Sequence, residues 1–177
     1  MLNFYKTVDN RILRLDAPEP GCWISAISPT EAEVAFLTND LAVEPDFVRA
    51  ALDEEESSRI ESEEGQTLVI VDYPSAEEQA DENKTLLYTT LPMGIISTPD
   101  YVITVCIEEN LTISDMAEGR VKGLQTAIRS RTILHLSSHM SKPRSGWDDA
   151  EKACPALPET PFLWSCISEL AALAFPG

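Results

Sequence analysis

Three apolar runs in the middle of the chain constrain its fold most strongly. Residues 67–73, 86–97 and 101–107 are rich in β-branched and aliphatic side chains, and turn residues separate the last two. Two of these runs are too continuous to leave one face in water, so we expect strands that are covered on both faces. A sheet with such strands needs helices on each side of it.

The remaining strands are expected from shorter patterns along the chain. Residues 2–8 and 11–15 are half-apolar and are joined by Asp9 and Asn10, a spacing typical of a hairpin. Residues 22–27 predict a third strand and residues 58–63 an edge strand. We expect the strand at 67–73 to end at Pro74, and the polar residues 75–84 to form a mobile hairpin loop.

Two early helices are predicted by start signals. Ser28 is expected to cap the first, with Pro29 at its first position and Glu31 bonding back to the cap. The second begins at Glu44–Pro45. The residues expected to face inward from these helices are Val34, Leu37, Leu41, Phe47, Val48, Ala51 and Leu52. With further helical segments after Leu111 and from Arg129, the chain predicts an α/β fold: a mixed sheet of about seven strands in three α/β/α layers.

The charge of the chain excludes some partners. Its formal net charge is -17, and residues 31–82 hold seventeen Asp and Glu against Arg49 and Arg59 alone. This charge opposes binding to nucleic acid or to an anionic membrane surface. No run of about 18 apolar residues is present, so we expect a chain that does not itself insert into a membrane and is cytoplasmic as it stands. The acidic face either keeps the domain soluble or attracts divalent cations or basic partners, and both interpretations stay open.

Motifs for catalysis are weak. His135 and His139 are four residues apart, as metal ligands on a helix can be, but no general base or third ligand accompanies them. The four cysteines form no Cys-x-x-Cys pair and are interpreted as reduced, buried small residues. Acidic runs such as 53–56 lie among other charges. A general acid needs a carboxyl group whose pKa is raised in an apolar cleft, and these runs do not provide one. We therefore expect no enzyme and no tightly bound cofactor, with Mg²⁺ as a possible weak ligand of the carboxylates.

The order of several segments is similar to one known family. These segments are Trp23–Ile24, the Ser-Pro-Thr-Glu helix start at 28–31, the stretches 44–56 and 58–61, the strand 68–73, the run 91–96 and the strand 101–106. Together they resemble the cytosolic N-terminal domain of CorA-type magnesium transporters over roughly residues 1–136. Residues 129–136 are similar to the start of that family's long helices.

This resemblance implies a regulatory function. Full-length members sit in the cell membrane with this domain on the cytoplasmic side, form homopentamers around a pore, and sense cytosolic Mg²⁺. This sequence contains neither the membrane helices nor the Gly-Met-Asn signature, so we expect that it cannot conduct ions alone. Where the family places a regulatory carboxylate pair, this chain has Arg49 and Ala50, and only Asp53 and Glu54 are nearby substitutes as metal ligands.

The end of the chain departs from the resemblance. We expect residues 1–140 to form the CorA-like domain and residues 141–177 to be an atypical Pro-rich tail. Its different composition favours a frameshift, a truncation or a mispredicted gene end over an evolved replacement. The leading hypothesis is a regulatory domain of a divalent-cation transporter, and the alternative is a free-standing soluble binding protein with the same fold. Genomic DNA downstream of codon 140 distinguishes the two, because only the first predicts membrane helices in another frame.

Overall fold

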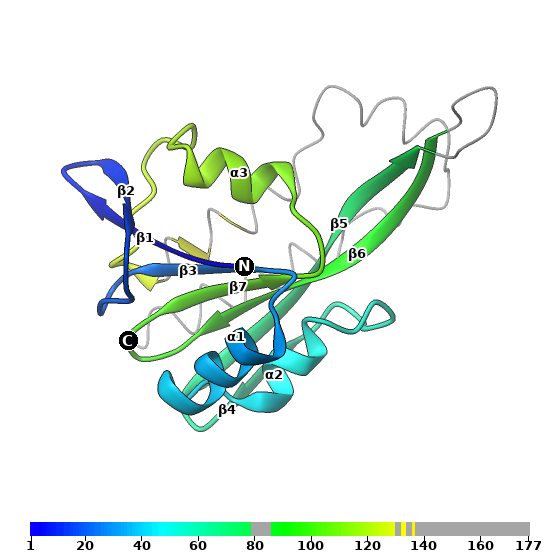
Figure 1. Cartoon of the computed structure of the whole chain (residues 1–177), viewed down its shortest axis with the longest axis horizontal. Helices are drawn as coiled ribbons and strands as arrows, with labels where there is room; N and C mark the ends of the chain where they lie inside the picture. Colours follow the sequence, from blue (N-terminus) through cyan, green and yellow to red (C-terminus); the bar gives the residue numbers. More distant parts are fainter. Residues whose placement is uncertain (79–85, 130–131, 134–135, 137–177) are drawn as a thin grey trace, which may run out of the picture.

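The computed structural model describes residues 1–78, 86–129, 132–133 and 136 (Figure 1). The strands are β1 (Leu2–Val8), β2 (Arg11–Leu15), β3 (Trp23–Ile27), β4 (Ile60–Glu63), β5 (Gln66–Glu78), β6 (Leu86–Ser97) and β7 (Val102–Cys106). The helices are α1 (Glu31–Ala35), the π-helical turn η1 (Phe36–Asp40), α2 (Pro45–Ala50) and α3 (Leu111–Ala117).

The seven strands form one mixed sheet in the order β2-β1-β3-β7-β6-β5-β4. The central pair, β3 and β7, is parallel, with Trp23 opposite Val102, and the other neighbouring pairs are antiparallel. β2 and β4 are therefore the two edges of the sheet. The predicted mixed sheet of about seven strands is confirmed.

Side chains alternate between the two faces of this sheet and form two separate hydrophobic clusters. Trp23 faces the α3 side, whereas the next residue, Ile24, faces the side of α1 and α2. All five residues of β7 are buried, as expected for a strand covered on both faces. Figure 1 shows α3 over one face and α1 with α2 over the other, which confirms the three-layer arrangement.

The first hairpin forms as its turn residues predict. Asp9 and Asn10 have φ values of 50° and 60°, the left-handed conformation that a two-residue turn of type I′ needs at both positions. Asn and Asp tolerate this conformation better than other residues with a side chain. The turn sets the pairing of β1 with β2, in which Val8 lies opposite Arg11.

The predicted start of the first helix is wrong by two residues. Ser28 is not the cap: its N–H donates to the carbonyl oxygen of Cys106 at 2.8 Å, so the chain is still bonded to the sheet there. Thr30 is the N-cap instead, and its side chain and that of Glu33 form a capping box. Pro29 consequently precedes the helix, and Glu31 lies exposed in its first turn.

The predicted end of the fifth strand is also wrong. β5 continues through Pro74 to Glu78, so residues 75–78, expected in a loop, pair with β6. β4 pairs only with the first part of β5, up to Val69, and beyond Ile70 no strand among the described residues pairs with that side of β5. A proline is tolerated there because the missing N–H leaves no partner unsatisfied. The rest of the expected loop, at 79–84, lies outside the described residues.

Close backbone contact fixes α2 on the sheet. Ala51, which ends α2, lies directly over Gly94 of β6: a Cβ atom added at Gly94 would be 2.4 Å from the Cβ atom of Ala51. Phe47 and Val48 of the same helix are buried in the cluster on this face, as predicted. The position of the acidic turn after α2 therefore depends on this glycine.

The last part of the described chain covers the α3 face. Residues 129, 132, 133 and 136 are helical, and Ile133 and Leu136 are buried in the cluster on the α3 side. This agrees with the helix expected from Arg129. His135, His139 and the tail at 141–177 lie outside the described residues.

Candidate functional site

The candidate metal ligands Asp53 and Glu54 lie in the turn that follows α2. Both side chains are exposed, and Glu55 beside them is exposed as well. The Asp53 N–H donates to the carbonyl oxygen of Ala50 at 3.3 Å, and its carboxylate accepts the N–H of Glu55 at 3.0 Å. Asp53 therefore stabilises the turn itself, while the outward oxygen atoms of this turn remain accessible to a hydrated cation.

The two arginines of the acidic segment 31–82 pair with carboxylates outside this turn, so they do not neutralise the negative charge of Asp53, Glu54 and Glu55. Arg49 pairs with Asp46 at 2.5 Å on the outside of α2. Arg59 pairs with Glu56, and with Glu61 at 3.1 Å. Both arginines between residues 31 and 82 thus have carboxylate partners.

The hydrogen bond between Glu56 and Arg59 favours the charged form of both side chains. Hydrogen bonding from Arg59 keeps the pKa of Glu56 below its usual value, and the bond from Glu56 raises the pKa of Arg59. Glu56 and Arg59 are half-buried and behave as a structural pair. This pair was not predicted from the sequence, although Glu56 and Glu61 lie three and two residues from Arg59, a spacing at which opposite charges can pair.

No preformed metal cage is found in the part of the chain that the structure describes. No three His, Cys, Asp or Glu side chains converge there. The sequence offered Asp53 and Glu54, by position only, as substitutes for the family's carboxylate pair. The structure keeps both on one turn, and among the described residues no third ligand from another element joins them. This donor set fits a cation that keeps most of its water, as Mg²⁺ commonly does.

The described cysteines are structural. Cys22 and Cys106 are free and buried, in the clusters on opposite faces of the sheet. Burial raises the pKa of both thiols, and that of Cys106 to about 12. A thiol with such a pKa stays protonated near neutral pH and is a poor nucleophile. This agrees with their interpretation as buried small residues.

A second feature missed from the sequence fixes the base of the β5–β6 ribbon. The Tyr73 hydroxyl donates to the Glu108 carbonyl oxygen at 3.2 Å and accepts the Glu108 N–H at 3.3 Å. The Ser75 hydroxyl donates to the Glu108 carboxylate at 2.9 Å. Burial raises the pKa of Tyr73 to about 12, so its hydroxyl keeps its proton. The contact of Ser75 with Glu108 was not predicted, because the strand was expected to end at Pro74 with Ser75 in a loop.

Comparison with solved structures identifies the fold. The soluble domain of CorA from Methanocaldococcus jannaschii is 17% identical with a TM-score of 0.56, over 78% of this chain and 56% of that chain. The complete CorA magnesium transporter from the same organism is 16% identical with a TM-score of 0.55, over 90% and 53%. The ZntB cytoplasmic domain from Vibrio parahaemolyticus is 13% identical with a TM-score of 0.57, over 97% and 71%. The chain thus spans about half the length of the two CorA structures.

The family of this chain follows from comparison with models of protein families. Comparison with curated proteins finds no significant match. Among the described residues, no helix is both long and apolar enough to cross a membrane. The model of the family described as CorA-like Mg2+ transporter protein matches residues 19–140, which is more than half of the chain. This protein therefore belongs to the CorA-like Mg²⁺ transporter family.

Proposed function

We propose that this chain is a cytosolic regulatory domain of a CorA-like divalent-cation transporter and that it is not an enzyme. The family match over residues 19–140 carries this proposal. Two similar structures support it by what they are: one is a magnesium transporter and another is a cytoplasmic domain. On this proposal the partners are divalent cations and further copies of the chain, in a pentamer with the pore-forming part of the transporter, and nucleic acid is not a partner.

The acidic turn after α2 supplies the response to cations. Asp53, Glu54 and Glu55 are consecutive and exposed, and neighbouring like charges repel each other by roughly 1 kcal/mol even in water. A hydrated Mg²⁺ ion next to the turn reduces this repulsion without displacing all of its water. Binding is therefore weak, and the occupancy of the turn follows the cation concentration in the millimolar range.

A paired-variant titration tests this site. The amide shifts of the full chain are followed by NMR as Mg²⁺ is added at constant ionic strength, for the parent and for the D53N/E54Q variant. The D9N/D16N variant loses the same charge on the hairpin, at the other end of the sheet, and is the control. Asp9 and Asp16 are exposed, and Asn fits the positive φ at position 9.

The proposal predicts millimolar affinity in the parent, with the largest shifts at the amides of residues 53–56. D53N/E54Q should lose several-fold in affinity for Mg²⁺. D9N/D16N should stay within about twofold of the parent, because exposed charges that are farther from the turn than a Debye length are largely screened. Sub-micromolar binding would contradict a weak sensor. An equal loss in both variants would show general screening and would remove the site from Asp53 and Glu54.

A further inference from the structure

The sheet has one long stretch of strand that is paired on a single side. Residues 71–78 of β5 pair with β6, and on their other side no strand among the described residues pairs with them. Figure 1 shows β5 and β6 continuing together past β4. A strand that is paired on one side presents a row of free N–H and C=O groups, with which a strand of another molecule can pair.

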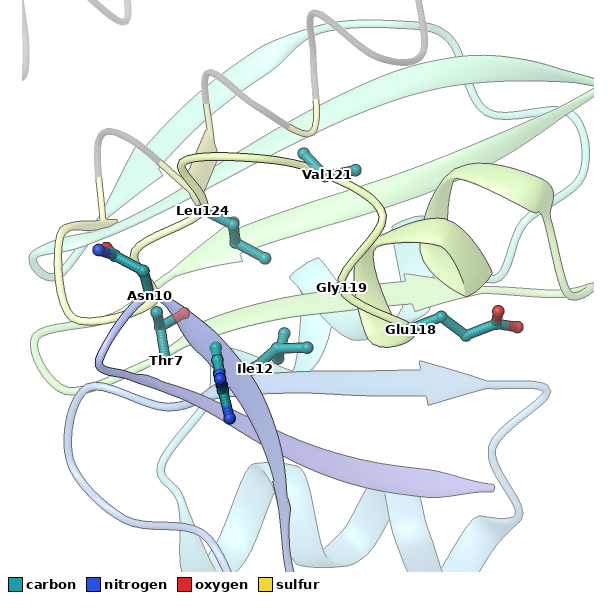
Figure 2. A pocket seen from close by; sticks show the side chains of 8 residues that line it. Thr7, Asn10, Ile12, Glu118, Gly119, Val121 and Leu124 are labelled. Carbon is teal, nitrogen blue, oxygen red and sulfur yellow. The ribbon is translucent and has the colours of Figure 1, made fainter.

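The two outer strands of the sheet are protected by their length and charge. β2 has five residues with both arginines exposed, and β4 has four residues with both glutamates exposed. The segment after α3 also packs against the first hairpin: Figure 2 shows Gly119 near Ile12, and a Cβ atom at Gly119 would be 3.3 Å from Cγ2 of Ile12. Short and charged edges of this kind are poor templates for an added strand.

One hydrogen bond shows which backbone groups of β5 face the β4 side. The Ile70 N–H donates to the Arg59 carbonyl oxygen at 2.9 Å, so the backbone polar groups of Ile70 face that side. Successive residues of an antiparallel strand direct these groups to opposite sides. Asp72, Pro74 and Ala76 therefore face the same side as Ile70, whereas the residues between them face β6.

Pro74 interrupts this row of backbone groups. It has no N–H, so the row from residue 72 to residue 76 offers a donor at each end and none at its centre. A strand added here would leave the carbonyl oxygen opposite Pro74 without a donor, and removing such a group from water is costly. Asp72 beside it is exposed, and its carboxylate accepts the Ser58 hydroxyl at 2.9 Å. Charge on an edge opposes an added strand as well.

We propose that Pro74 prevents β5 from pairing with the β5 strand of a second copy of this chain. Two identical strands can meet about a two-fold axis as an antiparallel pair, in which both copies use the same edge. Centred on position 74, this pair would set residue 72 of one copy opposite residue 76 of the other, and the two prolines opposite each other. Both donors at the centre of the pair are then missing. This role of Pro74 does not depend on the proposed cation-transport function.

Sedimentation velocity of the full chain over a range of concentrations tests this role. P74T restores the N–H in a residue that strands favour, and P74A restores it without a β-branched side chain. The control P74T/A76P returns a proline to the next position that faces the β4 side, where no bond to β6 is lost. All four proteins are compared in about 1 M NaCl, where the Debye length is about 3 Å, so that repulsion between acidic residues does not mask the effect. Circular dichroism should show the same fold in all of them.

P74T and P74A should dimerise at a concentration about tenfold lower than the parent, because each copy gains a donor for a hydrogen bond between the copies. Amide hydrogen exchange at positions 72 and 74 of P74T should slow as its concentration rises. P74T/A76P should sediment like the parent. The proposal is overturned if P74T and P74A sediment like the parent at every concentration, if P74T/A76P dimerises as readily as P74T, or if concentration leaves exchange at positions 72 and 74 unchanged.

Discussion

At the scale of single residues, Glu33 connects the start of the first helix to the start of the first strand. Its carboxylate accepts the N–H of Thr30 at 2.8 Å and the N–H of Leu2 at 2.9 Å, and it pairs with the amino group of Met1 at 3.1 Å. The bond from the Thr30 backbone is the main reason that the pKa of Glu33 is lowered to about 2. The charged form of this carboxylate therefore stabilises the fold.

The E33A variant should be less stable near neutral pH by about 1 kcal/mol, the usual effect of losing a cap. A lowered pKa means that the contribution of Glu33 is fully present above the ordinary pKa of about 4.5 and is lost as the pH falls toward 2. The difference between parent and E33A in urea unfolding should shrink across this range. E31A, which removes an exposed carboxylate from the same helical turn, is the control. A difference that persists undiminished at pH 2 would contradict this role.

At the scale of elements, the contact between α2 and β6 can be tested at Gly94. In G94A the new methyl group meets the Cβ atom of Ala51, which should destabilise the domain by about 1–3 kcal/mol. Replacing Ala51 by Gly in the same chain removes the atom that clashes. We expect the A51G/G94A double variant to be more stable than G94A alone in urea unfolding, even though A51G alone costs about 0.5–1 kcal/mol. If the double variant is the less stable by the sum of both effects, the two elements do not pack as described.

The same scale shows which elements could be predicted from the sequence. The strands at 2–8, 11–15 and 86–97 follow from local patterns, and their bounds match the structure. The cap at Ser28 and the strand end at Pro74 were wrong because each depends on a partner distant in sequence. Ser28 stays on the sheet through Cys106, and Pro74 is tolerated because β4 is too short to reach it. The local residues that signal a helix start or a strand end predict neither the bond from Ser28 to Cys106 nor the length of β4.

The candidate site was predictable to a similar degree. The charge of the turn at Asp53 and Glu54 is plain in the sequence, and so is its place after a helix. The pairing of Arg59 with Glu56 and Glu61 could only be guessed from spacing. The contacts of Tyr73 and Ser75 with Glu108 join segments that are distant in the sequence. Long-range packing of this kind has no signal in a single sequence.

At the scale of the whole molecule, two truncations test where the domain ends. A chain that ends at Gly123 loses Leu124, Ile133 and Leu136, which are buried on the α3 face. Each fully buried aliphatic side chain contributes about 1.5–3 kcal/mol, so this chain should melt well below the parent. A chain that ends at Ser141 should melt like the parent or higher, because we expect the tail to be dispensable. If removing residues 142–177 unfolds the domain, the tail is an integral part of it and the frameshift interpretation is wrong.

The central claim, that this domain responds to divalent cations, is tested most directly by its melting temperature in two salts. A ligand that binds the folded state raises the melting temperature according to its concentration and affinity, beyond any screening by ionic strength. At equal ionic strength, millimolar MgCl₂ should therefore raise the melting temperature of the full chain more than NaCl does, and D53N/E54Q should lose most of that extra increase. Equal increases in the two salts would contradict the claim, because they would show only screening of the acidic surface.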